Sequence, residues 1–228
     1  MKGRLIGIGV GPGDPDLLTL KAVKAIQECD VVAVPSPENS DRTAFFIVEK
    51  YLEGKQLLEC KFSMEIDLQN RKESRANVGK DICKLLEEGK TVGFITLGDP
   101  CIYSTYMYIH KIVTKEGFQT EIVPGITSFS AASAVLNTSL CEGEEMLHII
   151  PASCEYDIEK LIQMSGNKVI MKSGRKLKHV LSILKQKGLS DRTQIVERCT
   201  MEDQRIFTID EFEKVNDAGY FCVVIVKE

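Results

Sequence analysis

The sequence has no apolar run that approaches the ~20 residues needed to cross a membrane as a helix. It also lacks the long apolar core of a signal peptide, because residues 1–4 lead directly into a short strand-like run. These two absences predict a cytoplasmic protein with no membrane partner.

An excess of positive charge is absent too, since the 228 residues carry a net charge of −4. Surfaces that bind nucleic acid are usually basic, so a nucleic-acid partner is not expected. Histidine is scarce, and His110, His148 and His179 are too far apart in the chain to form a ligand-spaced cluster. We therefore expect no metal bound by the protein.

The eight cysteines include no C-x-x-C pair and are scattered along the chain. A dense disulfide scaffold would be shorter and richer in loops. The cysteines are therefore interpreted as reduced thiols that mostly serve as small buried hydrophobic side chains. This use of cysteine agrees with a cytoplasmic location.

What the sequence does contain is a regular alternation of short apolar runs and amphipathic helical patterns. Such an alternation predicts an α/β fold. A chain of 228 residues can form one large domain or two small ones. We expect two α/β domains, residues 1–124 and 125–228, with a mixed sheet in the second because its last strands are closely spaced.

Local signals predict where the first elements begin and end. Asp14 and Pro15 are typical of a helix start, so the first helix is expected over residues 17–27. Pro35 and Pro37 are expected to end the second strand.

The stretch TLGDPCIYST, residues 96–105, follows a buried strand pattern and precedes a helix whose apolar face includes Tyr106 and Ile109. It therefore lies at the carboxyl end of a strand, where open α/β sheets bind ligands. Gly98 allows a ligand to approach the backbone, and Asp99 is a hydrogen-bond acceptor. These residues form the first candidate binding loop.

A second glycine-rich loop, GVGPGD at residues 9–14, follows the first strand. Its glycines do not fit the dinucleotide fingerprint, and no acidic residue ends the second strand to bind a ribose. The chain also lacks a G-x-x-x-x-G-K-[ST] phosphate loop. Both loops are therefore expected to bind, through backbone and shape, a partly apolar cofactor that carries its own reactivity.

Three segments resemble the signatures of the tetrapyrrole methylase family, and they occur in the expected order. They are GVGPGDPDLLTLKA at residues 9–22, GDPCIY at 98–103 and VPGITS at 123–128. The resemblance covers nearly the whole chain. It implies two α/β domains with S-adenosylmethionine in the cleft between them, a tetrapyrrole substrate and a homodimer.

The resemblance also implies which residues bind the cofactor. Leu97, Gly98 and Asp99 are expected at its methionine end, while Thr127 and Ser128 begin a helix whose amino terminus can bind a carboxylate. On the adenine side of the cofactor the expected contact is Met171, and Lys172 is the alternative if the register is shifted by one residue. The expected cofactor contacts are Pro12, Leu97, Gly98, Asp99, Ile102, Tyr103, Thr127, Ser128, Met171 and Cys199.

Within the family, residues 103–106 (YSTY) and 197–204 (ERCTMEDQ) are most similar to the C20-methyltransferases of corrin synthesis, which act on precorrin-2 or cobalt-factor II. Uroporphyrinogen methyltransferases usually have Gly-Arg where this chain has Ser104 and Thr105. The alternatives are a uroporphyrinogen-III C-methyltransferase, a methyltransferase of the same fold that acts on RNA or protein, and a non-catalytic binder. The sequence does not distinguish a metal-free from a cobalt-bound substrate.

No catalytic residue is assigned from the sequence. An activated sulfonium methyl mainly has to be aimed at a nucleophilic meso carbon in a site that excludes water. The proton leaves to substrate nitrogens, to water or to a tyrosine such as Tyr106. The carboxylates of the substrate predict cationic groups nearby, and Arg42, Lys172 and Arg175 are candidates whose alternative role is a surface salt bridge.

Overall fold

The computed structural model describes residues 2–37, 42–63, 67–153, 156–215 and 221–228, apart from the side chain of Arg175. The chain divides into two compact units, Met1–Thr127 and Ser128–Glu228. Among the described residues, no helix combines the length and the apolar character that crossing a membrane requires.

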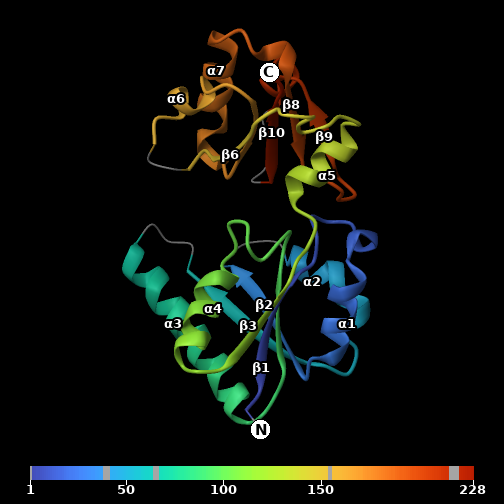
Figure 1. The fold of residues 1–228 in the computed structure, drawn as a ribbon, viewed down its shortest axis with the longest axis vertical. Coiled ribbons are helices and arrows are strands. Elements are labelled where there is room, and N and C mark those ends of the chain that lie inside the picture. Colours follow the sequence, from blue (N-terminus) through green and yellow to red (C-terminus); the bar gives the residue numbers. More distant parts are fainter. Residues whose placement is uncertain (1, 38–41, 64–66, 154–155, 216–220) are drawn as a thin grey trace. The chain divides into compact units, whose positions relative to one another are not determined.

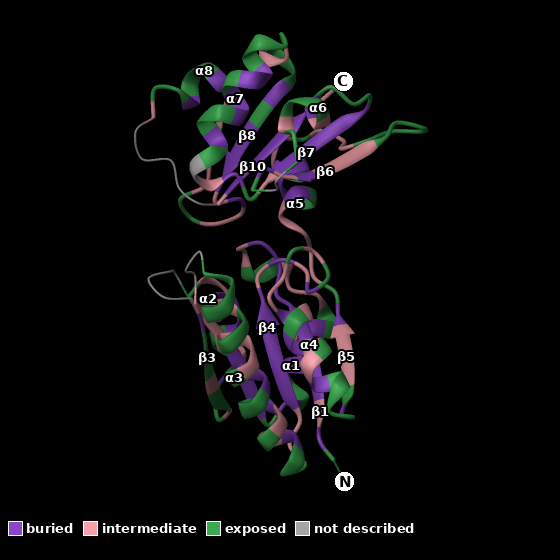
Figure 2. Ribbon diagram, turned by 90° about the vertical axis from the view of Figure 1, so that its left-hand side faces the viewer, coloured by how far each residue is buried: buried purple, intermediate pink, exposed green. Residues whose placement is uncertain are grey.

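Unit 1 contains a parallel sheet in the order β3-β2-β4-β1-β5. Each strand is followed by a crossover to the next, which confirms the α/β class predicted from the alternating pattern. The central strand β4 is buried along its whole length (Figure 2). The strands are β1 (Arg4–Gly9), β2 (Val31–Pro37), β3 (Gln56–Phe62), β4 (Val92–Thr96) and β5 (Gln119–Val123).

Helices cover both faces of this sheet, with α3 and α4 on one side and α1 on the other (Figure 1). Alternate residues of a strand point to opposite faces, so Leu5 packs in the α3 and α4 layer, whereas Ile6 and Ile8 pack with α1 and α2. The helices are α1 (Leu20–Glu28), α2 (Thr43–Val48), α3 (Leu68–Glu87) and α4 (Tyr106–Lys115), and 3-10 turns lie at Pro15–Leu17 and Glu49–Tyr51.

Unit 2 has a five-stranded sheet in the order β6-β7-β10-β8-β9. Strand β10 is antiparallel to both of its neighbours, while β6 and β7 are parallel, which confirms the predicted mixed sheet. The elements are α5 (Ser128–Val135), β6 (Leu147–Pro151), α6 (Ile158–Ile162), β7 (Asn167–Met171), α7 (Leu177–Gln186), β8 (Thr193–Glu197), β9 (Arg205–Phe207), α8 (Ile209–Phe212) and β10 (Cys222–Val226), with 3-10 turns at Gly174–Lys176 and Ser190–Arg192.

The first helix begins later than the sequence predicts. The Asp14 side chain accepts a hydrogen bond from the Asp16 N–H at 2.8 Å and so starts a 3-10 turn. Leu18 is extended, and Thr19 then caps α1 by accepting from the Ala22 N–H at 3.0 Å. Two consecutive caps therefore divide a segment that the pattern merges into one helix.

The prediction that Pro35 and Pro37 end the second strand is wrong for Pro35, because β2 continues through it to its last residue, Pro37. The two prolines pair with Cys60 and Phe62 of β3. Its pairing with β4 stops at Ala33. Beyond that residue β2 has a strand partner on one side, so a missing N–H on the other side costs no ladder hydrogen bond.

Candidate functional site

The three signature segments meet at one edge of the sheet in unit 1. They follow β1, β4 and β5, which are neighbours in the order β4-β1-β5 and run parallel. Their carboxyl ends therefore share an edge, as the ligand-binding edge of an α/β sheet requires.

The first two loops are joined by backbone hydrogen bonds. The Gly98 N–H donates to the Gly11 carbonyl at 2.7 Å, and the Gly11 N–H donates back to the Gly98 carbonyl at 3.3 Å. This isolated antiparallel bridge connects segments 87 positions apart, from residue 11 to residue 98. Both glycines have positive φ, +80° for Gly11 and +73° for Gly98, which other residues rarely adopt.

The Asp99 carboxylate fastens the second loop to the third. Its Oδ1 accepts from the Cys101 N–H at 2.7 Å, and its Oδ2 accepts from the Gly125 N–H at 2.9 Å. Both oxygens thus bind backbone donors of the protein. This geometry assigns Asp99 the role of positioning the loops. Contacts to a ligand are then left to the neighbouring backbone groups.

Close packing of backbone explains why glycine stands at two further positions. A Cβ added at Gly125 would lie 2.2 Å from the Gly98 carbonyl oxygen, and one added at Gly9 would lie 2.5 Å from the Gly125 nitrogen. Contacts this short with backbone atoms cannot be relieved by turning a side chain. Gly9 and Gly125 therefore hold the loops of the candidate site together, although the sequence analysis did not single them out. Their place inside two signatures was the available signal.

Ser104 is a third residue to which the sequence analysis assigned no role. Its Oγ lies 2.8 Å from Thr96 Oγ1 and accepts from the Tyr106 N–H at 3.1 Å. It thereby joins the end of β4 to the start of α4. A serine two residues before a helix is a recognisable capping signal.

The predicted contacts of unit 1 form a mixed apolar and backbone surface. Pro12 is buried, and Leu97 and Ile102 are half-buried. Tyr103 is 47% exposed and has a φ of 51°. Space above Gly98 is open, because an added Cβ would meet only the Ile126 carbonyl oxygen, at 4.0 Å.

The remaining predicted contacts lie at or beyond the end of unit 1. Thr127 is its last residue, and Ser128 is the first residue of α5 in unit 2. Met171 ends β7, and Cys199 follows β8. Because β7 and β8 are both antiparallel to β10, which lies between them, Met171 and Cys199 are at the same edge of the second sheet.

Tyr106, a candidate proton acceptor, belongs to the core. It is fully buried between Phe94 and the layer of α3 and α4, and its hydroxyl donates to the Glu121 carbonyl at 3.1 Å. Burial raises the pKa of its phenol well above the ordinary value. A residue in this position does not reach a ligand at the loops.

Two of the three candidate cations can be placed. Arg42 lies 3.4 Å from a carboxylate oxygen of Glu59 and stacks over the Phe45 ring. It therefore forms a surface salt bridge, the alternative to binding a substrate carboxylate. Lys172 is exposed next to Met171, with a φ of 55°. The Arg175 side chain lies outside the described part of the chain.

The described cysteines at and beside the predicted contacts favour the neutral thiol over the thiolate. Burial raises the pKa of the Cys199 thiol to about 11, and burial and Asp99 raise that of Cys101. In the described part of the chain, no group of three or more His, Cys, Asp or Glu side chains could hold a metal ion.

Comparisons with known proteins agree with this architecture. Residues 4–213 match the family model of the Tetrapyrrole (Corrin/Porphyrin) Methylases. The chain is 36% identical over 229 residues to the "Probable cobalt-precorrin-2 C(20)-methyltransferase" of Methanocaldococcus jannaschii, a match that covers 98% of this chain and 96% of that protein. It is 32% identical over 235 residues to the "Precorrin-2 C(20)-methyltransferase" of a Sinorhizobium species, covering 98% and 95% of the two chains.

The fold is also similar to a crystal structure of uroporphyrin-III C-methyl transferase from Thermus thermophilus complexed with S-adenyl homocysteine. The TM-score is 0.75 at 19% identity, and the match covers 99% of this chain and 98% of that one. This likeness confirms the predicted fold class.

Replacing Asp99 by asparagine tests its fastening role. An amide offers one oxygen, so its NH2 group would face either the Cys101 or the Gly125 N–H donor. We expect Asp99→Asn to lower the stability of unit 1 by about 1–3 kcal/mol. Urea denaturation followed by circular dichroism measures this loss, and hydrogen exchange reports the Gly125 amide directly.

The exposed Asp16 provides the matched control. Asp16→Asn makes the same chemical change and should leave both measurements unaltered. Unchanged protection of the Gly125 amide in Asp99→Asn would contradict the assigned role.

Proposed function

The chain belongs to the tetrapyrrole methylase family, and we propose that it transfers a methyl group from S-adenosylmethionine to C20 of precorrin-2, metal-free or cobalt-bound, in cobalamin biosynthesis. The observation that carries this proposal is the nearly full-length identity of 36% and 32% to two proteins named as C20-methyltransferases of this macrocycle. Enzymes of this family are S-adenosylmethionine-dependent C-methyltransferases.

The loops of unit 1 fit the methionine end of this cofactor. Gly98 leaves open space where a side chain would stand, while Leu97 and Ile102 offer apolar side chains. We propose that the backbone of these loops holds the cofactor, because the Asp99 carboxylate is engaged by the protein itself. When bound, S-adenosylmethionine supplies an electrophilic methyl group.

The main contribution of the protein is then to position the methyl donor and the acceptor carbon. Backbone held by glycine contacts and by Asp99 is rigid, and fixed orientation accounts for much of the rate of a transfer between two bound reactants. Apolar walls such as Pro12 and Leu97 exclude water from the reacting atoms. In the second unit, Met171 and Cys199 are proposed as the adenine-side contacts.

The substituted carbon must lose a proton after the transfer. The burial of Tyr106 removes it from the three acceptors considered. Substrate nitrogens and water are left, and we propose that one of these takes the proton. Lys172, exposed beside Met171, is the proposed partner for a substrate carboxylate.

The assembly and the location are proposed on narrower grounds. The family resemblance supports a homodimer, which sedimentation of the full chain tests directly. The described cysteines are all free thiols, which supports a cytoplasmic location.

Methyl transfer itself is the direct test. The full chain is incubated with carbon-13 methyl-labelled S-adenosylmethionine and either metal-free or cobalt-bound precorrin-2, and carbon-13 NMR locates the new methyl. We expect label at C20, and the better substrate identifies the metal state. Uroporphyrinogen III serves as a third substrate in a separate incubation: label at its C2 or C7, or no label on either form of precorrin-2, would reject the proposal.

Gly125→Ala tests the backbone contact on which the loops depend. The new Cβ would lie 2.2 Å from the Gly98 carbonyl oxygen, so the loops must separate. We expect affinity for S-adenosylmethionine to fall about tenfold or more, as measured by calorimetry. Gly54→Ala is the control for a general loss of stability, because a Cβ there meets nothing within 4 Å while its φ of +72° strains an alanine. An equal loss of affinity in both variants would show that the effect is not local.

Tyr106→Phe separates a core role from a chemical one. The variant keeps the ring and removes the hydrogen bond to the Glu121 carbonyl. We expect a stability loss of about 1 kcal/mol with kcat unchanged. A large fall in kcat with unchanged stability would return Tyr106 to the mechanism.

A further inference from the structure

Unit 2 contains a cavity of about 280 Å³ that the methyl-transfer proposal does not use. It lies where β7 and β8 begin and β10 ends, beside the carboxyl ends of α6 and α7. Met171 is at the other end of β7, three residues from Lys168, or roughly 10 Å along the strand. The cavity is lined by Ile162, Gln163, Met164, Lys168, Lys187, Leu189, Arg192, Lys227 and Glu228.

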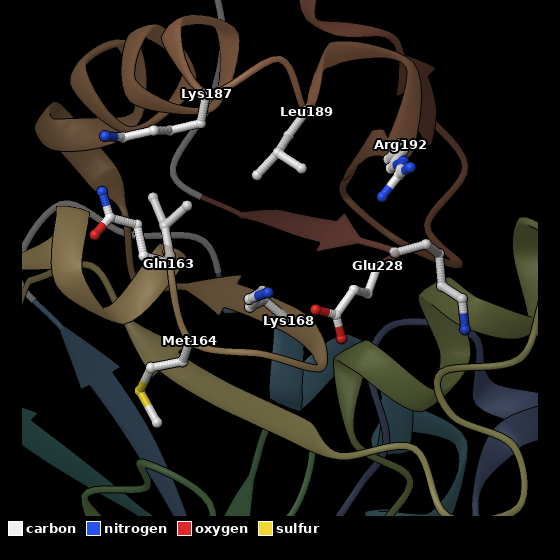
Figure 3. Close-up of a pocket in the computed structure, with 9 residues that line it drawn as sticks. Gln163, Met164, Lys168, Lys187, Leu189, Arg192 and Glu228 are labelled. Atoms are coloured by element: carbon white, nitrogen blue, oxygen red, sulfur yellow. The ribbon is translucent and has the colours of Figure 1, made fainter.

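Lys168 is the unusual member of this lining. It is only 5% exposed, yet no described residue forms a hydrogen bond or an ion pair with its side chain. Figure 3 shows it at the centre of the labelled residues, between Met164 and Glu228. Its aliphatic stem is buried, while its Nζ reaches the solvent of the cavity, because Ser173 Oγ is the one buried side-chain polar atom without a hydrogen bond in the described part of the chain.

The other cations of the lining differ in what they contact. Lys187 pairs with Glu159 at 2.6 Å, and Lys227 lies 3.5 Å from Glu145. Arg192 is exposed, and its guanidinium, like the Lys168 ammonium, has no partner among the described residues.

The one carboxylate of the lining is already engaged. Glu228 Oε2 accepts from the Gly166 N–H and from Ser165 Oγ. Lys168 and Arg192 thus provide two cationic groups that a bound anion could pair with, and Lys187 adds a third that would share its partner. Charge-assisted bonds of this kind recognise oxyanions.

We propose that this cavity binds a phosphate-type oxyanion, either free phosphate or the phosphate group of a small ester, with Lys168 and Arg192 as its cationic partners. The site belongs to unit 2 and does not depend on the function proposed above. The competing explanation is that Lys168 faces the negative ends of the α6 and α7 helix dipoles and binds nothing.

Calorimetric titration of the full chain with inorganic phosphate, at constant ionic strength in chloride, tests the site. We expect binding of one phosphate per chain and a melting temperature that rises with phosphate concentration. Lys168→Met keeps the length of the side chain and removes its charge, so phosphate affinity should fall about tenfold or more. Arg192→Gln should weaken binding as well, and it changes an exposed residue, so it serves if the first variant folds poorly.

Lys178→Met is the matched control, since Lys178 is an exposed lysine of α7 outside the lining. It should leave phosphate binding unchanged. A parallel titration with glycerol phosphate, an ester without an adenine ring, separates the sources: tighter binding than inorganic phosphate indicates an ester, and weaker binding indicates the free ion. Absence of phosphate binding, or equal affinity in Lys168→Met and the control, would overturn the proposal. Lys168 would then interact only with the carboxyl ends of α6 and α7.

Discussion

The approach of three backbone segments to the carbonyl oxygen of Gly98 is the constraint on which the candidate site depends. A Cβ at Gly9 would lie 2.7 Å from this oxygen, and a Cβ at Gly125 would lie 2.2 Å from it. The adjacency of β4, β1 and β5 brings the loops together, but only segments without side chains can come this close. Asp99 then holds the arrangement through the Gly125 N–H. The acidic residue of the second signature is therefore explained by loop geometry, and the ligand is left to main-chain groups and apolar walls.

Much of the fold could be predicted because local periodicity and tertiary packing agree. Strand β4 ends at Thr96 and α4 begins at Tyr106, as the pattern on either side of residues 96–105 indicates. The failures occurred where a contact distant in sequence decides the outcome. Pro35 remains in a strand because β4 stops pairing with β2 at Ala33, and no local pattern reveals where a neighbouring strand ends. The four-residue helix α8 was missed because its capping box, Thr208 with Glu211, stabilises a helix too short to show a period.

The candidate site could be predicted only in part from the sequence, for a similar reason. Its signature residues are contiguous in the sequence, so the loops could be found; which loops touch depends on strand order, which the sequence does not state. The expected cleft between the domains stays a prediction. The cavity around Lys168 had no signal at all, because a lysine at the start of the run KVIM has the pattern of an ordinary strand end. Its burial follows from the carboxyl ends of two helices that pack over β7.

Backbone strain gives independent support for the proposed cofactor residues. Among the described residues, five non-glycine positions have positive φ: Tyr103, Asn137, Lys172, Arg198 and Thr200. Four of these are a predicted contact or its direct neighbour, since Lys172 follows Met171 and the last two flank Cys199. Such conformations cost about 1–3 kcal/mol each and persist where the surrounding structure fixes them, often at ligand sites. Hydrogen bonds of the chain itself hold two of these positions, since the Arg198 N–H donates to the Phe221 carbonyl and the Thr200 N–H donates to Gln204 Oε1. The side chains of Tyr103 and Lys172 are exposed, so each of these two positions can present its loop to a ligand of its own unit.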